Sequence, residues 1–320
     1  MDRRLIECVP NFSEGRDPGK VEQIAGAIAS VPGAVLLDMH MDPDHHRSVI
    51  TVAGPPEAVA EAALRGVGRA VELIDLNVHR GGHPRIGAAD VVPLVPLEGI
   101  GMEQCVALAW EVGEEIWRRF RVPVYFYEAA ARRPDRVDLA AVRRGQFEAL
   151  RRQVLEDPDR APDVGEARLH PTAGAAAVGA RKFLIAYNIN LNTPRVEVAR
   201  QIARAIRASS GGFPHVKAIG IKLETRNLAQ VSINLTDFEH IPVERLQETV
   251  QREAERYGVS LAGSELVGLI PRRALEMAPE FYRRCDNFRP DLVLEDRLAA
   301  LESKWCSSTS ALPGPSAPTG

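Results

Sequence analysis

The alternation of apolar and polar positions predicts a regular succession of strands and helices in the first half of the chain. Short apolar or alternating runs are typical of strands, and longer runs with apolar residues three and four positions apart are typical of helices. The first half is predicted to form strands at 5–9, 34–38, 48–53, 91–97 and 123–127, and helices at 19–30, 55–74 and 102–120. Proline and glycine separate several of these runs.

The second half repeats this order, with predicted strands at 183–189, 216–223, 229–235 and 259–270 and helices at 195–208 and 243–257. Strand, helix, two strands, helix and strand is the split βαβ order of the ferredoxin-like fold. We therefore predict an α+β protein of two ferredoxin-like (βαββαβ-type) subdomains, with mostly antiparallel sheets and helices on one face. The expected subdomains are 1–181 and 182–305, and the Ser-, Pro- and Gly-rich segment 306–320 is expected to be disordered.

Composition narrows the class of protein. The 320 residues are 45% hydrophobic and 26% charged with a net charge of −3, and basic residues are interspersed with acidic ones, which argues against a nucleic-acid partner. No apolar run approaches the roughly 20 residues that cross a bilayer, and the N-terminus lacks the apolar region of a signal peptide. The four cysteines have no CxxC spacing, so reduced thiols and a cytoplasmic location are expected.

The segment 79–93 is the most informative for function, because it places two histidines, an arginine and an aspartate among glycines and prolines. His79 and His83 have the spacing of a helical zinc pair, but the glycines at 81 and 82 and Pro84 argue against a helix. Pro84 favours an extended His83, and a histidine held in this way can act as a general acid or base near neutral pH. The alternative is a surface or capping histidine. Arg85 can hold a substrate carboxylate or pair with an acid such as Asp90.

Three further clusters carry candidate chemistry. Residues 38–48 gather aspartates and histidines at a hairpin tip, which suits either a metal site or a solvated turn, and Arg47 beside them can clamp an anionic ligand. Ser13 and Glu14 follow the first strand, where capping of the next helix is favoured over anion binding. The small residues of 165–182 permit close approach of a flat ligand or of another element, and they contain no P-loop.

Taken together, these segments resemble the formiminotransferase domain, the folate-dependent glutamate formimidoyltransferase family. The resemblance extends in order over nearly the whole chain to about residue 271. The matching stretches are 7–15, 35–38, 83–88 with 90–91, 122–125, 179–185, 188–191, 227–232 and 263–271. Two positions depart from the family's usual residues: His46 replaces an asparagine, and Gly82 replaces a glutamate. The cyclodeaminase domain fused to some members is not expected in the segment after residue 306.

The resemblance implies two ferredoxin-like subdomains and transfer of a formimidoyl group from N-formimidoyl-L-glutamate to tetrahydrofolate, the co-substrate, without a metal. It assigns His83 as the catalytic acid/base. The substrate- and folate-binding residues that it implies, together with the arginine clamps considered above, are Gly165, Glu166, Ala167, Arg168, Leu169, His170, Pro171, Thr172, Ala173, Gly174, Asp38, Arg47 and Arg85. A homodimer is expected, with the product passed to a separate cyclodeaminase.

Three other functions remain open at this stage. A glutamate formyltransferase acting on 5-formyltetrahydrofolate differs from the formimidoyltransferase only by oxygen in place of NH on the transferred carbon. A folate-binding protein without turnover is a second alternative, although an intact His83 argues against it. A metal-dependent hydrolase built on the hairpin tip at Asp42, Asp44, His45 and His46 is the third.

Overall fold

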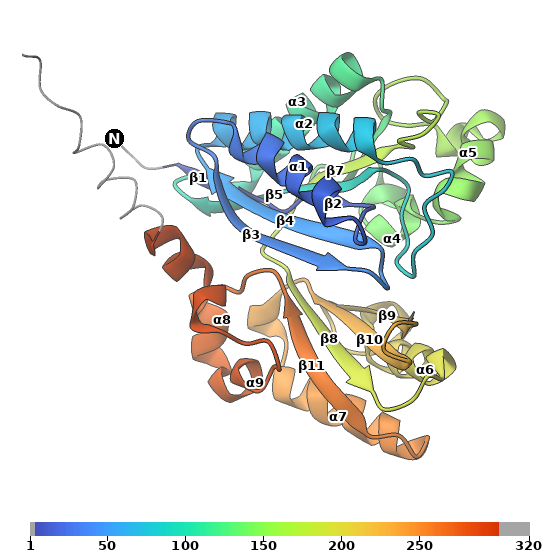
Figure 1. Ribbon diagram of the computed structural model, residues 1–320, viewed down its shortest axis with the longest axis vertical. Coiled ribbons are helices and arrows are strands. Elements are labelled where there is room, and N and C mark those ends of the chain that lie inside the picture. Colours follow the sequence, from blue (N-terminus) through green and yellow to red (C-terminus); the bar gives the residue numbers. More distant parts are fainter. Residues whose placement is uncertain (1–3, 301–320) are drawn as a thin grey trace, which may run out of the picture.

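The computed structural model describes residues 4–300, which form two lobes whose sheets face each other (Figure 1). The first lobe contains β1 Leu5–Cys8, β2 Asn11–Phe12, α1 Pro18–Ala29, β3 Val35–Asp42, β4 Arg47–Gly54, α2 Pro56–Leu73, β5 Ala89–Glu98, α3 Met102–Phe120, β6 Val124–Glu128, α4 Leu139–Val142, α5 Gln146–Glu156 and β7 Ala176–Ala180. The second contains β8 Ile185–Leu191, α6 Val196–Ile206, β9 Val216–Leu223, β10 Leu228–Leu235, α7 Val243–Arg256, β11 Leu261–Val267, α8 Arg272–Met277 and α9 Pro279–Arg283. The predicted disordered segment 306–320 lies outside the described residues.

Both lobes have the βαββαβ order that the sequence predicts. In the second lobe the strand order is β11-β8-β10-β9, with every neighbouring pair antiparallel. In the first lobe β5, β1, β4 and β3 pair in the corresponding order, also antiparallel. The prediction of an α+β protein with mostly antiparallel sheets is therefore confirmed.

The first sheet is larger than predicted, because it contains seven strands. Strand β7 pairs in parallel with both β5 and β6, and the short strand β2 lies between β4 and β5. The sequence of β7, Ala-Ala-Val-Gly-Ala, is fully buried and has little of the Val, Ile and aromatic content that marks a strand. From the sequence, this stretch is predicted to be a segment that closely approaches a flat ligand or another element, and not a strand.

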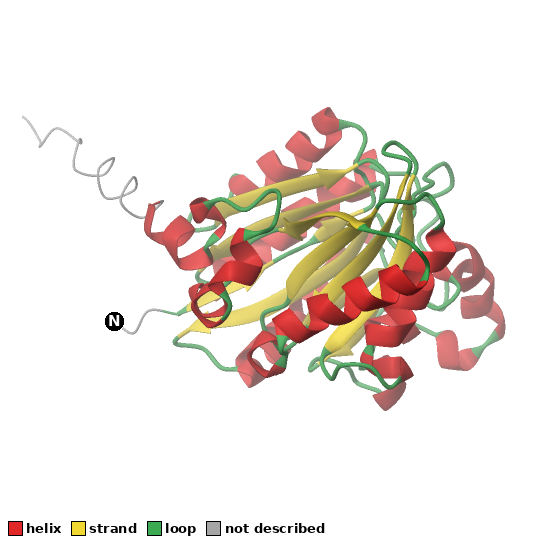
Figure 2. Ribbon diagram, turned by 90° about the horizontal axis from the view of Figure 1, so that it is seen from below, coloured by secondary structure: helices red, strands yellow, loops and turns green. Residues whose placement is uncertain are grey.

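Helices cover the outer face of each sheet, so the inner faces are left to meet. α1, α2 and α3 lie over the first sheet, and α6 and α7 lie beneath the second. Seen from below, helices lie in front of the strands (Figure 2). Each lobe has its own apolar core, and Leu37 and Ala53 of the first lobe join the core of the second. No helix within residues 4–300 is long and apolar enough to cross a membrane.

Helix α3 shows how local sequence sets an element. Its buried residues Cys105, Ala109, Val112, Gly113 and Ile116 recur at helical spacing and form one stripe against the sheet. The side chain of Gln104 accepts a hydrogen bond from the Gly101 N–H at the start of the helix, and two arginines in the last turn complement the helix dipole. The predicted bounds, 102–120, are those observed.

The start of α1 corrects one expectation. Its N-cap is Asp17, whose side chain accepts a hydrogen bond from the Lys20 N–H. Ser13 instead donates to the Gly87 carbonyl, and Glu14 accepts from the backbone N–H groups of residues 15–17. The side chains of Ser13 and Glu14 therefore shape the loop before the helix, because Asp17 lies closer to the first unpaired N–H groups.

Candidate functional site

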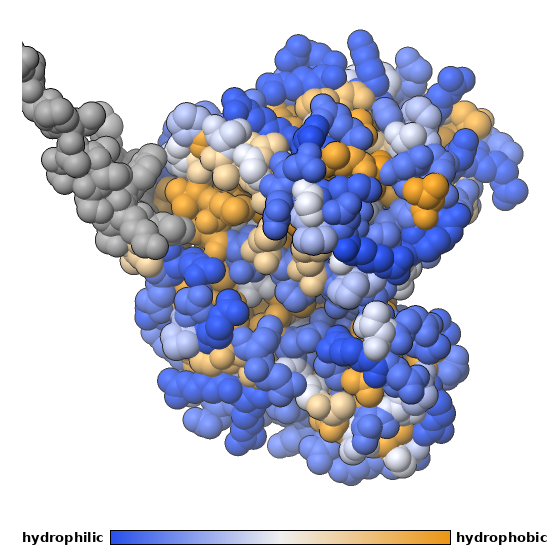
Figure 3. All heavy atoms as spheres, in the orientation of Figure 1, coloured by the Kyte–Doolittle hydropathy of each residue, from blue (hydrophilic) through white to orange (hydrophobic). Residues whose placement is uncertain are grey.

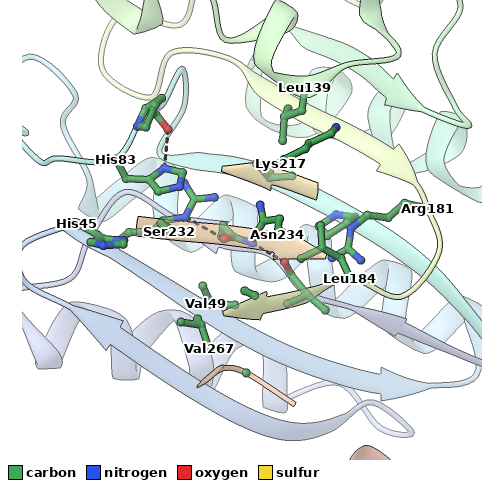
Figure 4. Close-up of a pocket in the computed structure, with 18 of the residues that line it drawn as sticks. His45, Val49, His83, Leu139, Arg181, Leu184, Lys217, Ser232, Asn234 and Val267 are labelled. Atoms are coloured by element: carbon green, nitrogen blue, oxygen red, sulfur yellow. Dashed lines mark hydrogen bonds between the residues drawn. The ribbon is translucent and has the colours of Figure 1, made fainter. Parts of the chain in front are cut away.

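A cavity of about 420 Å³ lies between the facing sheets and is lined by residues of both lobes. The molecule is visibly hollowed between the two lobes at the right of the view in Figure 3. His45 and His83 lie at one end of the cavity and Arg181 at the other, with Ser232 and Asn234 of β10 between them (Figure 4). A site in a crevice between two packed units is a common place for small-molecule binding.

The loop between α2 and β5 brings His83 into this cavity. Residues 81–88 contain no helix, as the glycines and Pro84 predict. The Nδ1 atom of His83 is 2.9 Å from the Pro84 carbonyl oxygen. A carbonyl oxygen only accepts hydrogen bonds, so Nδ1 carries the proton and Nε2 of the neutral ring keeps a lone pair. This tautomer presents Nε2 as a base, and no described residue forms a hydrogen bond with it.

The surroundings of His83 keep its ring neutral. Burial of the ring is the largest cause, and the positive charges of Arg47 and Arg143 add to it, so the pKa of His83 lies well below its usual range. The hydrogen bond to the Pro84 carbonyl opposes this shift only partly. A neutral imidazole with a free Nε2 can accept a proton at pH 7, as a general base requires.

Asp90 joins two arginines at the wall of the cavity. The Asp90 carboxylate is 0% exposed. Its Oδ2 atom accepts a hydrogen bond of 2.8 Å from Arg47 Nη1 and another from Arg143 Nη2, and its Oδ1 atom accepts from the Ile86 N–H. Arg47 also donates through Nε to Asn11 Oδ1. Because two guanidinium groups share one carboxylate, the trio carries a net positive charge, which suits an anionic ligand. Arg47 therefore lies where the sequence placed a candidate clamp.

Arg85 has a different partner from the one considered in the sequence. It is buried outside the cavity lining and pairs with Glu148 of α5 through both Nη atoms, at 2.7 and 2.6 Å. It also donates through Nε to His79 Nδ1. Asp90 is engaged by Arg47 and Arg143 instead, so the structure does not bring Arg85 and the cavity together.

His79 and His46 hold the loop that carries His83. Their rings are stacked with centroids 4.1 Å apart. His79 donates through Nε2 to the His46 carbonyl, and burial, first among several causes, lowers its pKa to about 4. His46 bridges the Arg80 carbonyl and the Glu14 carboxylate, at 2.9 and 3.1 Å. These contacts give His79 a structural role that the sequence did not reveal.

The hairpin tip between β3 and β4 contacts the second lobe. Asp44 accepts hydrogen bonds from the Thr225 N–H and hydroxyl, at 2.9 and 2.7 Å. His45 Nε2 lies 2.8 Å from Gln230 Oε1 of β10. Asp42 accepts from the His45 N–H. Each of these side chains thus shapes the hairpin tip or joins the two lobes. Within residues 4–300, no group of three or more His, Cys, Asp or Glu side chains could hold a metal ion.

The other residues that the resemblance implied lie outside the cavity lining. In the segment 165–174, Gly165 packs on Trp117 of α3, while Leu76 and Asn77 bind the carbonyls of Thr172 and Pro171. Asp38 of β3 is half-buried, and burial raises the pKa of its carboxyl. The structure therefore brings together His83 and Arg47 among the predicted residues, and it does not place the 165–174 segment or Asp38 beside them.

Several cavity residues escaped sequence reasoning, because their signal is distributed over distant strands and loops. The charged ones are Glu7, Glu128, Arg143, Arg181 and Lys217, and the neutral polar ones on the second sheet are Asn188, Ser232 and Asn234. The alternating polarity of β10 predicts a strand. The three polar residues on its inward face, Gln230, Ser232 and Asn234, are a further signal, since a buried sheet face normally carries apolar residues.

The two-lobed α+β fold thus encloses a charged cavity that contains a neutral histidine and two arginines sharing one carboxylate. Comparison with known proteins identifies the class. The N-terminal subdomain model of the formiminotransferase domain matches residues 5–181, and the formiminotransferase domain model matches residues 186–298. The chain belongs to the formiminotransferase family, which transfers one-carbon groups.

Two relatives that the chain matches over nearly their whole length share one name, glutamate formimidoyltransferase. The chain is 45% identical to the glutamate formimidoyltransferase of Streptococcus pyogenes serotype M1, over 89% of this chain and 95% of that protein. It is 46% identical to the glutamate formimidoyltransferase of Thermoplasma acidophilum, over 92% and 97%. The formimidoyltransferase-cyclodeaminase of Mus musculus is 44% identical over 88% of this chain, which spans 53% of that longer protein.

Proposed function

We propose that this protein is a folate-dependent glutamate formimidoyltransferase, which moves a formimidoyl group from N-formimidoyl-L-glutamate to tetrahydrofolate. The observation that carries the proposal is the neutral His83 with a free Nε2 in a cationic cavity, in a chain 45–46% identical to two proteins of that name. Both substrates carry carboxylates, and the cavity is lined by Arg47, Arg143 and Arg181, which can bind them.

The proposed reaction removes a proton from N5 of tetrahydrofolate and delivers one to the leaving nitrogen of glutamate. N5 of tetrahydrofolate attacks the formimidoyl carbon, the C=N bond becomes single, and a tetrahedral intermediate forms. His83 Nε2 takes the proton from the attacking nitrogen. The bond from carbon to the glutamate nitrogen then breaks as that nitrogen gains a proton, and C=N forms again. The products are 5-formimidoyltetrahydrofolate and L-glutamate.

A direct assay tests this function. The protein is incubated with tetrahydrofolate and N-formimidoyl-L-glutamate, and formation of 5-formimidoyltetrahydrofolate is followed with and without EDTA. We expect the same rate in both tubes. A parallel reaction with 5-formyltetrahydrofolate and glutamate tests the formyltransferase alternative. Tight folate binding without product from either pair would favour a non-catalytic folate-binding protein.

A variant tests the role of His83. His83→Ala should lower kcat by roughly 10²-fold or more while leaving folate affinity close to that of the wild type, because general acid–base catalysis typically contributes this much. His240→Ala, at an exposed histidine outside the cavity, is the matched control and should keep full activity. Near-normal turnover of the His83 variant would remove His83 from the proposed role.

A further inference from the structure

His45 is a second cavity histidine to which the family assignment gives no role. Its side chain is 7% exposed and lines the same cavity as His83, and the two ring centroids are 5.8 Å apart. Figure 4 shows the two rings at the same end of the cavity. His45 belongs to the hairpin tip of the first lobe, but its ring is held by the second lobe.

The second lobe fixes which nitrogen of His45 faces the cavity. Gln230, fully buried, donates through Nε2 to Glu265 Oε1 and Asn190 Oδ1, both at 2.9 Å. Because a carboxylate can only accept, the amide nitrogen must face Glu265 and the amide oxygen must face His45. The His45 Nε2 atom, 2.8 Å from that oxygen, therefore carries a proton.

The other ring nitrogen of His45, Nδ1, has no hydrogen-bond partner among residues 4–300. Although the residue is more than nine-tenths buried, this nitrogen is accessible from the cavity that His45 lines, where a ligand can reach it. The hydrogen-bond chain from His45 through Gln230 to the Glu265 carboxylate holds the ring in this orientation.

We propose that His45 is a second catalytic acid/base, which protonates the leaving nitrogen through Nδ1 while His83 deprotonates the attacking nitrogen. This inference rests on the proposed transfer reaction, which must remove a proton from one nitrogen and deliver one to another. His45 starts the cycle protonated on both nitrogens and ends it neutral. His83 starts neutral and ends protonated. A proton passing from His83 back to His45 restores both.

The two histidines are assigned different roles, His83 as base and His45 as acid, because their surroundings differ. His83 is flanked by Arg47 and Arg143, which favour its neutral form. His45 is instead linked by hydrogen bonds through Gln230 to the Glu265 carboxylate. The charged or titratable groups that face His45 are Asp42, Asp44 and His83 from the first lobe and, through Gln230, Glu265 with Arg226 from the second.

The pH dependence of kcat tests the proposal. The wild type should give a bell-shaped profile, in which the acidic limb reports His83 and the alkaline limb reports loss of the His45 proton. His45→Gln should lower kcat by about 100-fold and abolish the alkaline limb. His240→Gln, the same change at an exposed histidine, should keep the wild-type profile.

Two further variants separate catalysis from lobe contact. Thr225→Val removes the hydroxyl hydrogen bond to Asp44 and so weakens the same contact between tip and second lobe. It should change KM but keep the alkaline limb. Glu265→Gln keeps the shape of the network and removes its charge, so it should change the alkaline limb while leaving KM close to that of the wild type.

The outcomes separate this inference from the proposed function. If the wild type makes no product from either donor, the proposed function falls and the inference falls with it. If the wild type is active and His45→Gln keeps its rate and both limbs, the inference alone is overturned. ¹⁵N NMR of the histidine rings gives a readout independent of activity: a proton on Nδ1 rather than Nε2 of neutral His45 would also overturn it.

Discussion

Asp90 offers a sharp test of how the cavity wall is built. Asp90→Asn keeps the size of the side chain and removes the charge that two arginines share. The amide would leave Arg47 and Arg143 facing each other without a carboxylate. Its NH2 group would oppose either the donors of both arginines, which share one oxygen of Asp90, or the Ile86 N–H on the other oxygen. Both arginine side chains are only 11% exposed, so water cannot replace the lost partner well.

The size of the effect follows from that burial. Removing one partner from a buried ion pair costs about 3–5 kcal/mol, because the remaining charge stays buried and unpaired. We therefore expect Asp90→Asn to lower the free energy of unfolding by about 3–5 kcal/mol at pH 7. This loss in the free energy of unfolding can be measured by urea unfolding, followed by the fluorescence of Trp110 and Trp117 on α3 of the same lobe.

A matched control isolates the contribution of burial. Glu115 on α3 also binds two arginines, Arg118 and Arg119, with hydrogen bonds of 2.7 Å, but at the surface. Glu115→Gln should leave the urea midpoint within experimental scatter, since exposed ion pairs contribute little. A loss below about 1 kcal/mol for Asp90→Asn, or an equal loss in both variants, would refute the reasoning.

The same variant has a predictable pH dependence. Although burial alone would raise it, the pKa of Asp90 is lowered by Arg143 and Arg47. A carboxyl whose pKa is lower in the folded state adds stability above its unfolded pKa of about 4, and that stability is lost as pH falls through the folded value. The difference between wild type and Asp90→Asn should therefore be full at pH 5–7 and shrink below pH 4.

The remaining predictions concern buried groups and glycines. Burial raises the pKa of Glu7 to about 7, although Arg181 opposes this shift, so the buried carboxyl lowers the stability of the fold as pH rises from about 4.5 to 7. Glu7→Gln should therefore raise Tm at pH 8 and change it little at pH 4, and an unchanged Tm at pH 8 would contradict this. Gly26→Ala, at an open and exposed position of α1, should stabilise by about 0.5–1 kcal/mol in urea unfolding. Gly87→Ala should unfold at distinctly lower urea, because its Cβ would lie 1.9 Å from the Ala175 carbonyl oxygen, and an unchanged midpoint would argue against that close approach.

Sequence by itself determined those features that depend on local periodicity and chain stiffness. The bounds of α3 and of β9 are those predicted, and the remaining predicted elements differ mostly by one to four residues at their ends. The glycines at 81 and 82 with Pro84 excluded a helix around His83, as observed. These features are local because side-chain spacing and backbone restriction act over a few residues.

Tertiary structure alone decided which distant groups meet. Strand β7 escaped prediction because its small residues carry no alternation, and it becomes a strand by pairing on both sides with β5 and β6. The partners of Asp90 are 43 and 53 residues away, and His45 meets Gln230 from 185 residues away. Charge and hydrogen-bonding capacity are visible in a sequence, but the choice among partners depends on how the two sheets face each other.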